Sequence, residues 1–107
     1  MRWSVEALPV ARDEINGLPV GLRARMLRLM QMIEEHGLEQ VQAPHVRHLD
    51  GKLWELRAKA AEGIARGVYV AVQGRRVIVL HAFEKKTEKT PLRALALARA
   101  RLKELDL

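Results

Sequence analysis

Hydrophobic positions recur with a helical period over residues 20–36. At ~100° per residue, five apolar side chains of this segment share one narrow helix face. They are Leu22, Met26, Leu29, Met30 and Ile33. Pro19 precedes the segment and Gly37 follows it, as is common where helices begin and end. The pattern therefore predicts a helix from about Val20 to His36.

Two shorter elements are predicted before this helix. Residues 2–7 alternate apolar and polar side chains, with Trp3 and Val5 on one face, which indicates a strand. Pro9 suits the first turn of a helix, where its missing N–H would be unpaired in any case. This short helix is predicted to end near Asn16.

Three strand signals follow a polar segment, residues 38–50, which contains Pro44 and is predicted to be a loop. The strands are expected at residues 52–59, 64–72 and 76–83. Residues 73–75 form a good hairpin turn between the second and third strands. The third strand is an almost continuous apolar run, which indicates burial on both faces and a central place in the sheet.

A final helix is predicted from Pro91 to about Leu105, with Thr90 as its N-cap. Arg93 and Arg101 are expected to face away from its buried side. That buried arc is Leu92, Leu95, Ala98, Leu102 and Leu105. The element order β-α-α-β-β-β-α predicts one α+β domain over residues 1–107, a mainly antiparallel sheet packed against helices.

Composition and charge narrow the function. The chain of 107 residues has no cysteine, which excludes disulfides and thiolate metal sites. It has no apolar run of the ~20 residues that span a bilayer and no secretory signal, so a cytoplasmic protein without a membrane segment is expected. The net charge is +6, and all of the excess lies in the second half of the chain. Residues 51–107 carry thirteen bases and six acids, which favours a polyanionic partner.

Several kinds of active site are excluded or disfavoured. No glycine-rich phosphate loop is present. His45 and His48 have a spacing that metals use, but no third ligand accompanies them, and Ser4 is the only serine. No metal and no cofactor is therefore expected.

A cluster of cations on the sheet is the remaining candidate. Arg57 shares a strand face with Glu55, and Arg66 lies within the next strand. A charge in an apolar strand is costly unless it is paired or faces an open site, so Arg66 either forms a structural salt bridge with Glu55 or has a functional role. Phe83 either packs in the core or stacks on a base.

Lys85, Lys86 and Lys89 would converge with the two arginines if the three strands are sequential neighbours. Such a pocket suits cleavage of RNA by its own 2′-hydroxyl, because cations stabilise the negative charge that develops on the phosphorane. Crowded cations depress a lysine pKa, so Lys85 or Lys86 is a candidate base. Glu55 and His81 are the alternative bases, and no metal is required.

From residue 51 onward the sequence resembles the phage-derived HigB-type branch of the RelE/ParE toxin superfamily. The resemblance rests on the segment GKLWELR at 51–57, on Arg66 within a strand, and on HAFEKKTEKTP at 81–91 before the last helix. By element order it covers residues 10–105. Two departures are Ala82 in place of the usual glycine and Ala65 where an aromatic residue is frequent.

The resemblance implies the toxin of a type II toxin-antitoxin system, a ribosome-dependent endoribonuclease that cleaves mRNA in the ribosomal A site. It also implies a cognate helix-turn-helix antitoxin, through which alone the protein would reach operator DNA. The implied catalytic residues are Arg57, Arg66, Lys85 and Lys86. The implied substrate-binding residues are Glu55, Phe83, Thr87 and Lys89.

Two other functions stay open. The ParE branch of the superfamily inhibits gyrase without cleaving RNA. A nucleic-acid-binding protein without catalytic activity is the other alternative. The KKTEKTP segment favours the nuclease.

Overall fold

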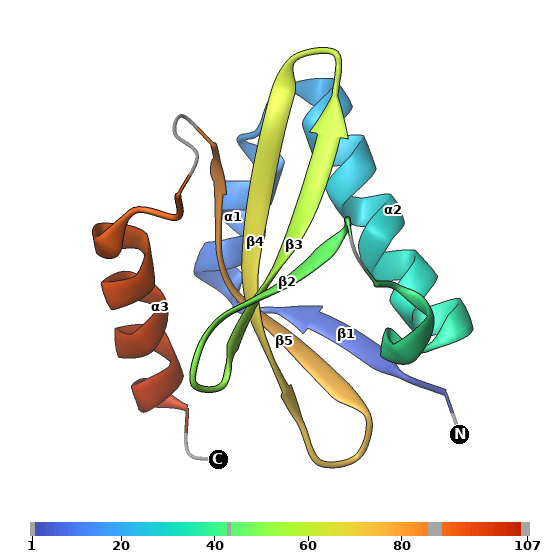
Figure 1. The fold of residues 1–107 in the computed structure, drawn as a ribbon, viewed down its shortest axis with the longest axis vertical. Coiled ribbons are helices and arrows are strands. Elements are labelled where there is room, and N and C mark those ends of the chain that lie inside the picture. Colours follow the sequence, from blue (N-terminus) through green and yellow to red (C-terminus); the bar gives the residue numbers. More distant parts are fainter. Residues whose placement is uncertain (1, 43, 86–88, 106–107) are drawn as a thin grey trace.

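The computed structural model describes residues 2–42, 44–85 and 89–105. Over these residues the chain forms three α-helices, one short 3-10 helix and a five-stranded sheet (Figure 1). The elements are β1 (Ser4–Ala7), α1 (Pro9–Asn16), α2 (Val20–His36), η1 (Leu38–Gln40), β2 (Val46–Asp50), β3 (Leu53–Ala60), β4 (Gly63–Val72), β5 (Arg76–Glu84) and α3 (Leu92–Glu104). The α+β class is confirmed.

The strand order across the sheet is β1-β5-β4-β3-β2. Only β1 and β5 run parallel, and the three other pairs are antiparallel, so the sheet is mainly antiparallel as expected. The three strands predicted from the second half of the chain are sequential neighbours. The strand β5 was predicted to be central, and it lies inside the sheet between β1 and β4, although β4 is the middle strand. The apolar run of β5 from Val77 to Leu80 is buried.

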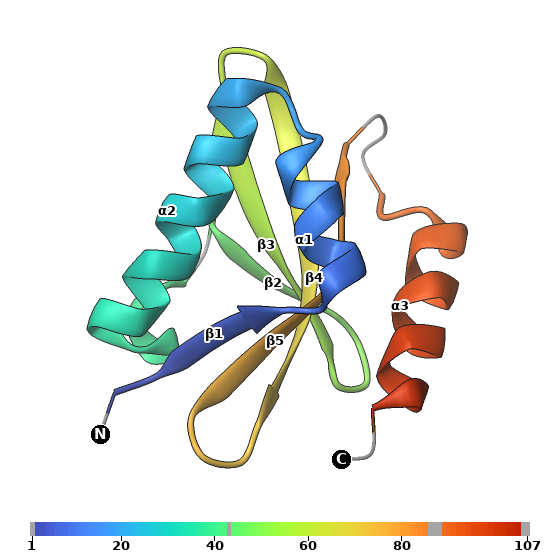
Figure 2. The ribbon, with the colours of Figure 1, turned by 180° about the vertical axis from the view of Figure 1, so that it is seen from behind.

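The first face of the sheet is covered by α1 and α2, which lie side by side on it (Figure 2). All five apolar residues predicted for the inner side of α2 are buried. They pack against alternate residues of the strands, such as Leu56, Tyr69 and Val79. The hydrophobic periodicity of α2 therefore predicted this core correctly.

The second face is covered by α3, and four residues of the predicted arc pack on its apolar cluster as expected, whereas the prediction for Leu92 is wrong. Its buried residues are Ala94 and Ala98, whereas Leu92 is 83% exposed. The helix begins at Leu92, so this side chain lies in the first turn, outside the contact with the sheet. No helix in the described part of the chain is long and apolar enough to cross a membrane.

The segment predicted as one loop contains an edge strand, β2, paired with β3. Its apolar residues Val46 and Leu49 pack on opposite faces of the sheet, so neither face shows the alternation that identifies a strand. Pairing with β3 supplies the backbone hydrogen bonds that the local pattern does not predict.

Candidate active site

The sheet register brings together three of the predicted site residues. Arg57 of β3 lies opposite Arg66 of β4, and Arg66 lies opposite Phe83 of β5. Their neighbours Leu56 and Ala65 belong to the core under α1 and α2. Because successive side chains of a strand point to opposite faces, the two arginines lie on the α3 side of the sheet.

Glu55 and Arg66 form a fully buried ion pair at the centre of this site. Arg66 Nη1 donates to Glu55 Oε2 over 3.3 Å, and both side chains are 0% exposed. Thr90 joins the pair, because its hydroxyl donates to Glu55 Oε2 over 2.8 Å and accepts a bond from Arg66. The expected salt bridge is confirmed. The N-cap prediction for Thr90 is wrong, since Pro91 holds that position and the hydroxyl binds the ion pair.

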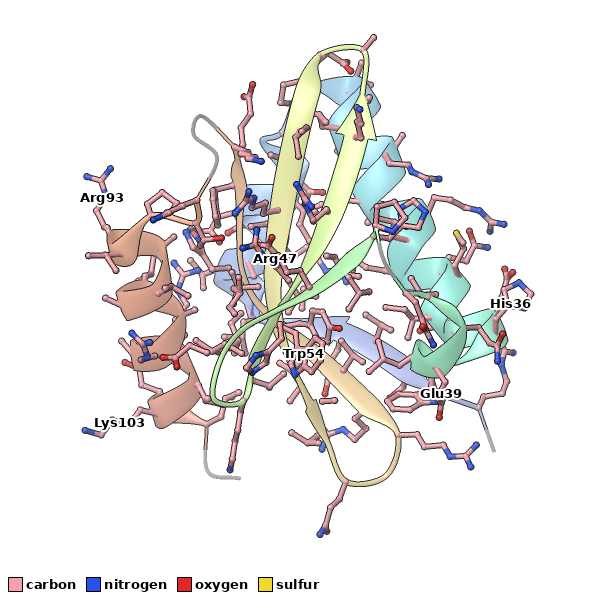
Figure 3. All side chains as sticks on the ribbon, viewed as in Figure 1. His36, Glu39, Arg47, Trp54, Arg93 and Lys103 are labelled. Atoms are coloured by element: carbon pink, nitrogen blue, oxygen red, sulfur yellow. The ribbon has the colours of Figure 1, made fainter. Side chains whose placement is uncertain are left out.

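A third arginine, Arg47, belongs to the same cluster. It lies opposite Glu55 in β2 and is exposed (Figure 3). Burial lowers the pKa of Arg66, Glu55 raises it, and the charges of Arg57 and Arg47 lower it, with a lowered pKa as the net result. Sequence reasoning missed Arg47 because its segment was predicted to be a loop. The guanidinium groups of Arg57 and Arg66 pair with the Glu55 carboxylate, and Arg47 adds a third positive charge on the adjacent strand, which leaves positive charge in excess.

Arg57 is the partly exposed partner of Glu55. Its side chain is 31% exposed, and its Nε lies 3.9 Å from Glu55 Oε1. That carboxylate oxygen is buried and makes no hydrogen bond with the described residues. A cavity of about 210 Å³ opens beside Arg57 and is lined by Pro44, His45, Arg57, Lys59 and Ile64. An anion can therefore approach Arg57, whereas Arg66 is covered.

The predicted lysines begin where β5 ends. The backbone N–H of Lys85 donates to Ile64 O over 2.7 Å, which ties this end of β5 to β4. Lys89 is exposed. Lys86 and Thr87 lie outside the described residues, so their part in the site stays a prediction.

A second polar network borders the site at the free edge of β5. His81 stacks on Phe83 with ring centroids 5.0 Å apart, and its Nδ1 lies 2.9 Å from Glu14 Oε1. Arg101 donates to both oxygens of Glu14, over 2.9 and 3.1 Å, and to Leu80 O over 2.9 Å. Arg101 was predicted to face away from the protein, and this prediction is wrong. The β5 edge offers it a carbonyl and a carboxylate that its own helix lacks.

This network shifts the pKa of Glu14. Burial raises it, but hydrogen bonds from Arg101, His81 and the Ala82 N–H outweigh burial, so the pKa lies below its ordinary value. Among the described residues, no three histidine, aspartate or glutamate side chains gather as they would around a metal ion. Arginine and lysine donors dominate the site, and these bind anions.

The fold and the site define a small α+β protein with a mainly antiparallel sheet and a cationic face. Its fold is that of RelE proteins. It is similar to a double arginine-to-alanine mutant of the E. coli toxin RelE in the free state, with a TM-score of 0.66 and 16% identity over 95% of this chain and 99% of the other.

Two further structures have the same fold. One is the toxin-antitoxin complex RelBE2 from Mycobacterium tuberculosis (TM-score 0.59, 16% identity, 79% of this chain and 100% of the other). The second is the archaeal RelE-RelB complex from Pyrococcus horikoshii OT3 (TM-score 0.57, 18% identity, 78% of this chain and 96% of the other).

Residues 13–103 match the family described as Phage derived protein Gp49-like (DUF891), and the chain belongs to this family. No curated protein sequence matches it significantly. The resemblance to a phage-derived family is thus confirmed at the level of the family, together with the RelE-type fold, and the HigB branch stays a prediction.

Proposed function

We propose that the protein is the toxin of a type II toxin-antitoxin system and a ribosome-dependent endoribonuclease of the HigB type. The observation that carries this proposal is the set of three arginines on adjacent strands, two of them paired with Glu55, with a cavity open beside Arg57. The RelE-type fold and the named toxin-antitoxin structures support it.

The proposed chemistry is cleavage of RNA by its own 2′-hydroxyl. A base removes the 2′ proton, the 2′ oxygen attacks phosphorus, and the bond to the 5′ oxygen breaks as a general acid protonates that oxygen, leaving a cyclic phosphate and a 5′-hydroxyl. Arg57 stabilises the negative charge on the phosphorane, and Lys85 and Lys86 share proton transfer and charge stabilisation. No metal takes part in this scheme.

The buried residues Arg66 and Glu55 position Arg57 in this proposal. Arg66 would reach a phosphate only after its bonds to Glu55 and Thr90 open, so we assign it first to holding Glu55 in place. Glu55 in turn lies beside Arg57 and orients its guanidinium toward the cavity. Phe83 and Lys89 border the substrate in this proposal, with Thr87 beside them.

Two partners belong to the proposal. A small shallow site orients a flexible RNA poorly, so the ribosome supplies most of the orientation through its A site. A cognate helix-turn-helix antitoxin neutralises the toxin, as the RelB partner in two of the similar structures suggests.

Cleavage in a translating extract tests the proposal through primer extension on the mRNA. The wild-type protein is expected to produce discrete new 5′ ends, and Arg57→Ala is expected to reduce their rate of formation by about 10²-fold, as for the loss of one transition-state donor. Lys103→Ala is the matched control, because Lys103 is exposed and projects from the C-terminal end of α3, away from the site (Figure 3).

Two results would contradict the proposal. Equal cleavage by Arg57→Ala and the wild type would exclude the assigned site. Intact messages together with induction of the SOS response in expressing cells would favour the gyrase-inhibiting alternative.

A further inference from the structure

A second cavity, of about 540 Å³, lies on the other face of the sheet, beyond the end of α2. Its walls are mostly apolar and include Trp3, Trp54 and Tyr69, together with Leu38 of η1. Trp3 and Trp54 are the two tryptophans of the chain. The volume is in the range of small-ligand sites, about 300–1,000 Å³.

Tyr69 presents a polar group to this cavity. The side chain is 1% exposed, and its hydroxyl makes no hydrogen bond with any described residue. Burial raises the pKa of Tyr69 to about 12, so the phenol is neutral and keeps its proton at physiological pH. Tyr69 lines the cavity, and a neutral phenol can donate a hydrogen bond to a ligand there or accept one from it.

Trp54 is held in place at the cavity wall. Its ring meets the edge of the His48 ring at a centroid distance of 4.8 Å, and the His48 Nε2 lies 2.8 Å from Gly51 O. The indole is nevertheless 38% exposed, so part of a large aromatic ring faces solvent beside the cavity. An aromatic surface is therefore open to a ligand.

Glu39 supplies the one formal charge among the described residues that line the cavity. Its carboxylate has no ion-pair or hydrogen-bond partner in the described part of the chain. Gly37, at φ +90°, brings this carboxylate and the indole of Trp3 close together. A Cβ at Gly37 would lie 2.8 Å from Glu39 Oε2 and 3.2 Å from Trp3 Nε1, so only glycine leaves both side chains where they are.

We propose that this cavity binds an organic cation with an apolar body, such as a quaternary ammonium group or an arginine side chain of a partner protein. Aromatic rings attract cations through their negative faces, with tryptophan the strongest, and Glu39 adds a full negative charge at the rim. Figure 3 labels Trp54 and Glu39, which reach the cavity from β3 and η1. The proposal is independent of the nuclease reaction, because Arg57 lies on the opposite face.

Intrinsic fluorescence tests the proposal directly, since both tryptophans line the cavity. The probes are tetramethylammonium chloride and N-acetyl-arginine amide. Their neutral counterparts are tert-butyl alcohol and N-acetyl-citrulline amide, and sodium chloride controls for ionic strength. A saturable change in emission is expected with at least one cationic probe and with neither neutral compound.

Glu39→Gln is expected to weaken this binding by about fivefold, the upper range for an exposed ion pair. Glu104→Gln, an exposed glutamate at the end of α3, is the matched control and is expected to bind like the wild type. Binding of the arginine derivative alone would assign the site to a partner's side chain, and binding of tetramethylammonium would extend it to small quaternary ammonium ions. Equal binding of the neutral compounds, no response to either cation, or unchanged affinity in Glu39→Gln would overturn the proposal.

Discussion

The two faces of the sheet are built on different principles. Under α1 and α2 the interior is apolar, and the inner residues of α2 are buried to 6% exposure or less. On the α3 side, an apolar cluster shares its space with the buried Glu55–Arg66 pair and with Arg57. The helix α3 contributes only two buried residues, both alanines. The first face is a closed apolar core. The second face carries charged side chains, of which Arg57 is partly exposed.

Burying ions has an energetic consequence that apolar packing lacks. Taking a carboxylate and a guanidinium out of water costs several kcal/mol each, and their attraction offsets this cost only with good geometry and further hydrogen bonds. Here Thr90 supplies hydrogen bonds to both ions. The comparison predicts that the stability of the second face depends on an intact Glu55–Arg66 pair. The stability of the first face is predicted to depend on complete packing of its apolar core.

The largest effect is expected from Glu55→Ala. The variant leaves the Arg66 guanidinium buried without its carboxylate, which typically costs about 3–5 kcal/mol of unfolding free energy. Chemical denaturation followed by circular dichroism measures this loss. Glu104→Ala, which removes an exposed glutamate, is expected to change stability by less than about 0.5 kcal/mol.

The double variant Glu55→Leu with Arg66→Met separates charge from packing. Replacing a buried ion pair by apolar residues of similar volume is often neutral or stabilising by about 1–4 kcal/mol. Recovery of stability in the double variant, with loss of RNA cleavage, would show that the pair serves the site. A double variant as unstable as Glu55→Ala would contradict the comparison, because the stability of the second face would then depend on packing, as on the first face, and not on the ion pair.

On the first face, Leu29→Ala is expected to destabilise the protein by about 3 kcal/mol, because it leaves a cavity in a closed apolar core. Leu29 is 0% exposed, whereas Leu27 on the same helix is 38% exposed. Leu27→Ala is therefore the matched control, with an expected loss below about 1 kcal/mol. Denaturation midpoints of the two variants measure the difference, and equal losses would contradict the assignment of this core.

The elements with a strong periodic pattern could be predicted from the sequence, and the edge strand could not. The bounds of α2 were predicted as observed, because one apolar stripe and two flanking residues, Pro19 and Gly37, specify them. The strand β2 pairs with the next strand, β3, but its apolar residues Val46 and Leu49 lie on opposite faces, so the alternation that predicts a strand is missing. Because this strand was predicted to be a loop, Arg47 was missing from the predicted site.

In the candidate site, alternation placed Glu55, Arg57 and Arg66 on one face, which the structure bears out. Alternation could not predict how deeply each side chain is buried. Arg66 is fully buried, whereas Arg57 is partly exposed and lines the cavity. The difference depends on the segment before α3, because Thr90 of that segment forms hydrogen bonds with both Arg66 and Glu55. The polar contacts of Arg101 depend likewise on α1 and β5, which lie far away in the sequence.

The smallest of these effects is expected where the two faces meet, at Glu14 of α1. Its carboxylate joins Arg101 of α3 to the free edge of β5 through the Ala82 N–H. Glu14→Gln removes the charge and is expected to cost about 1–2 kcal/mol at pH 7, as for hydrogen bonds to a charged group. Because the pKa of Glu14 is lowered in the folded protein, this contribution is fully present above the unfolded carboxyl pKa of about 4.3 and is lost as the pH falls through the lower folded value. Denaturation of both proteins across this range measures it: the difference should shrink as the pH falls, and a gap that stays constant would mean that the carboxylate's charge does not hold the two faces together.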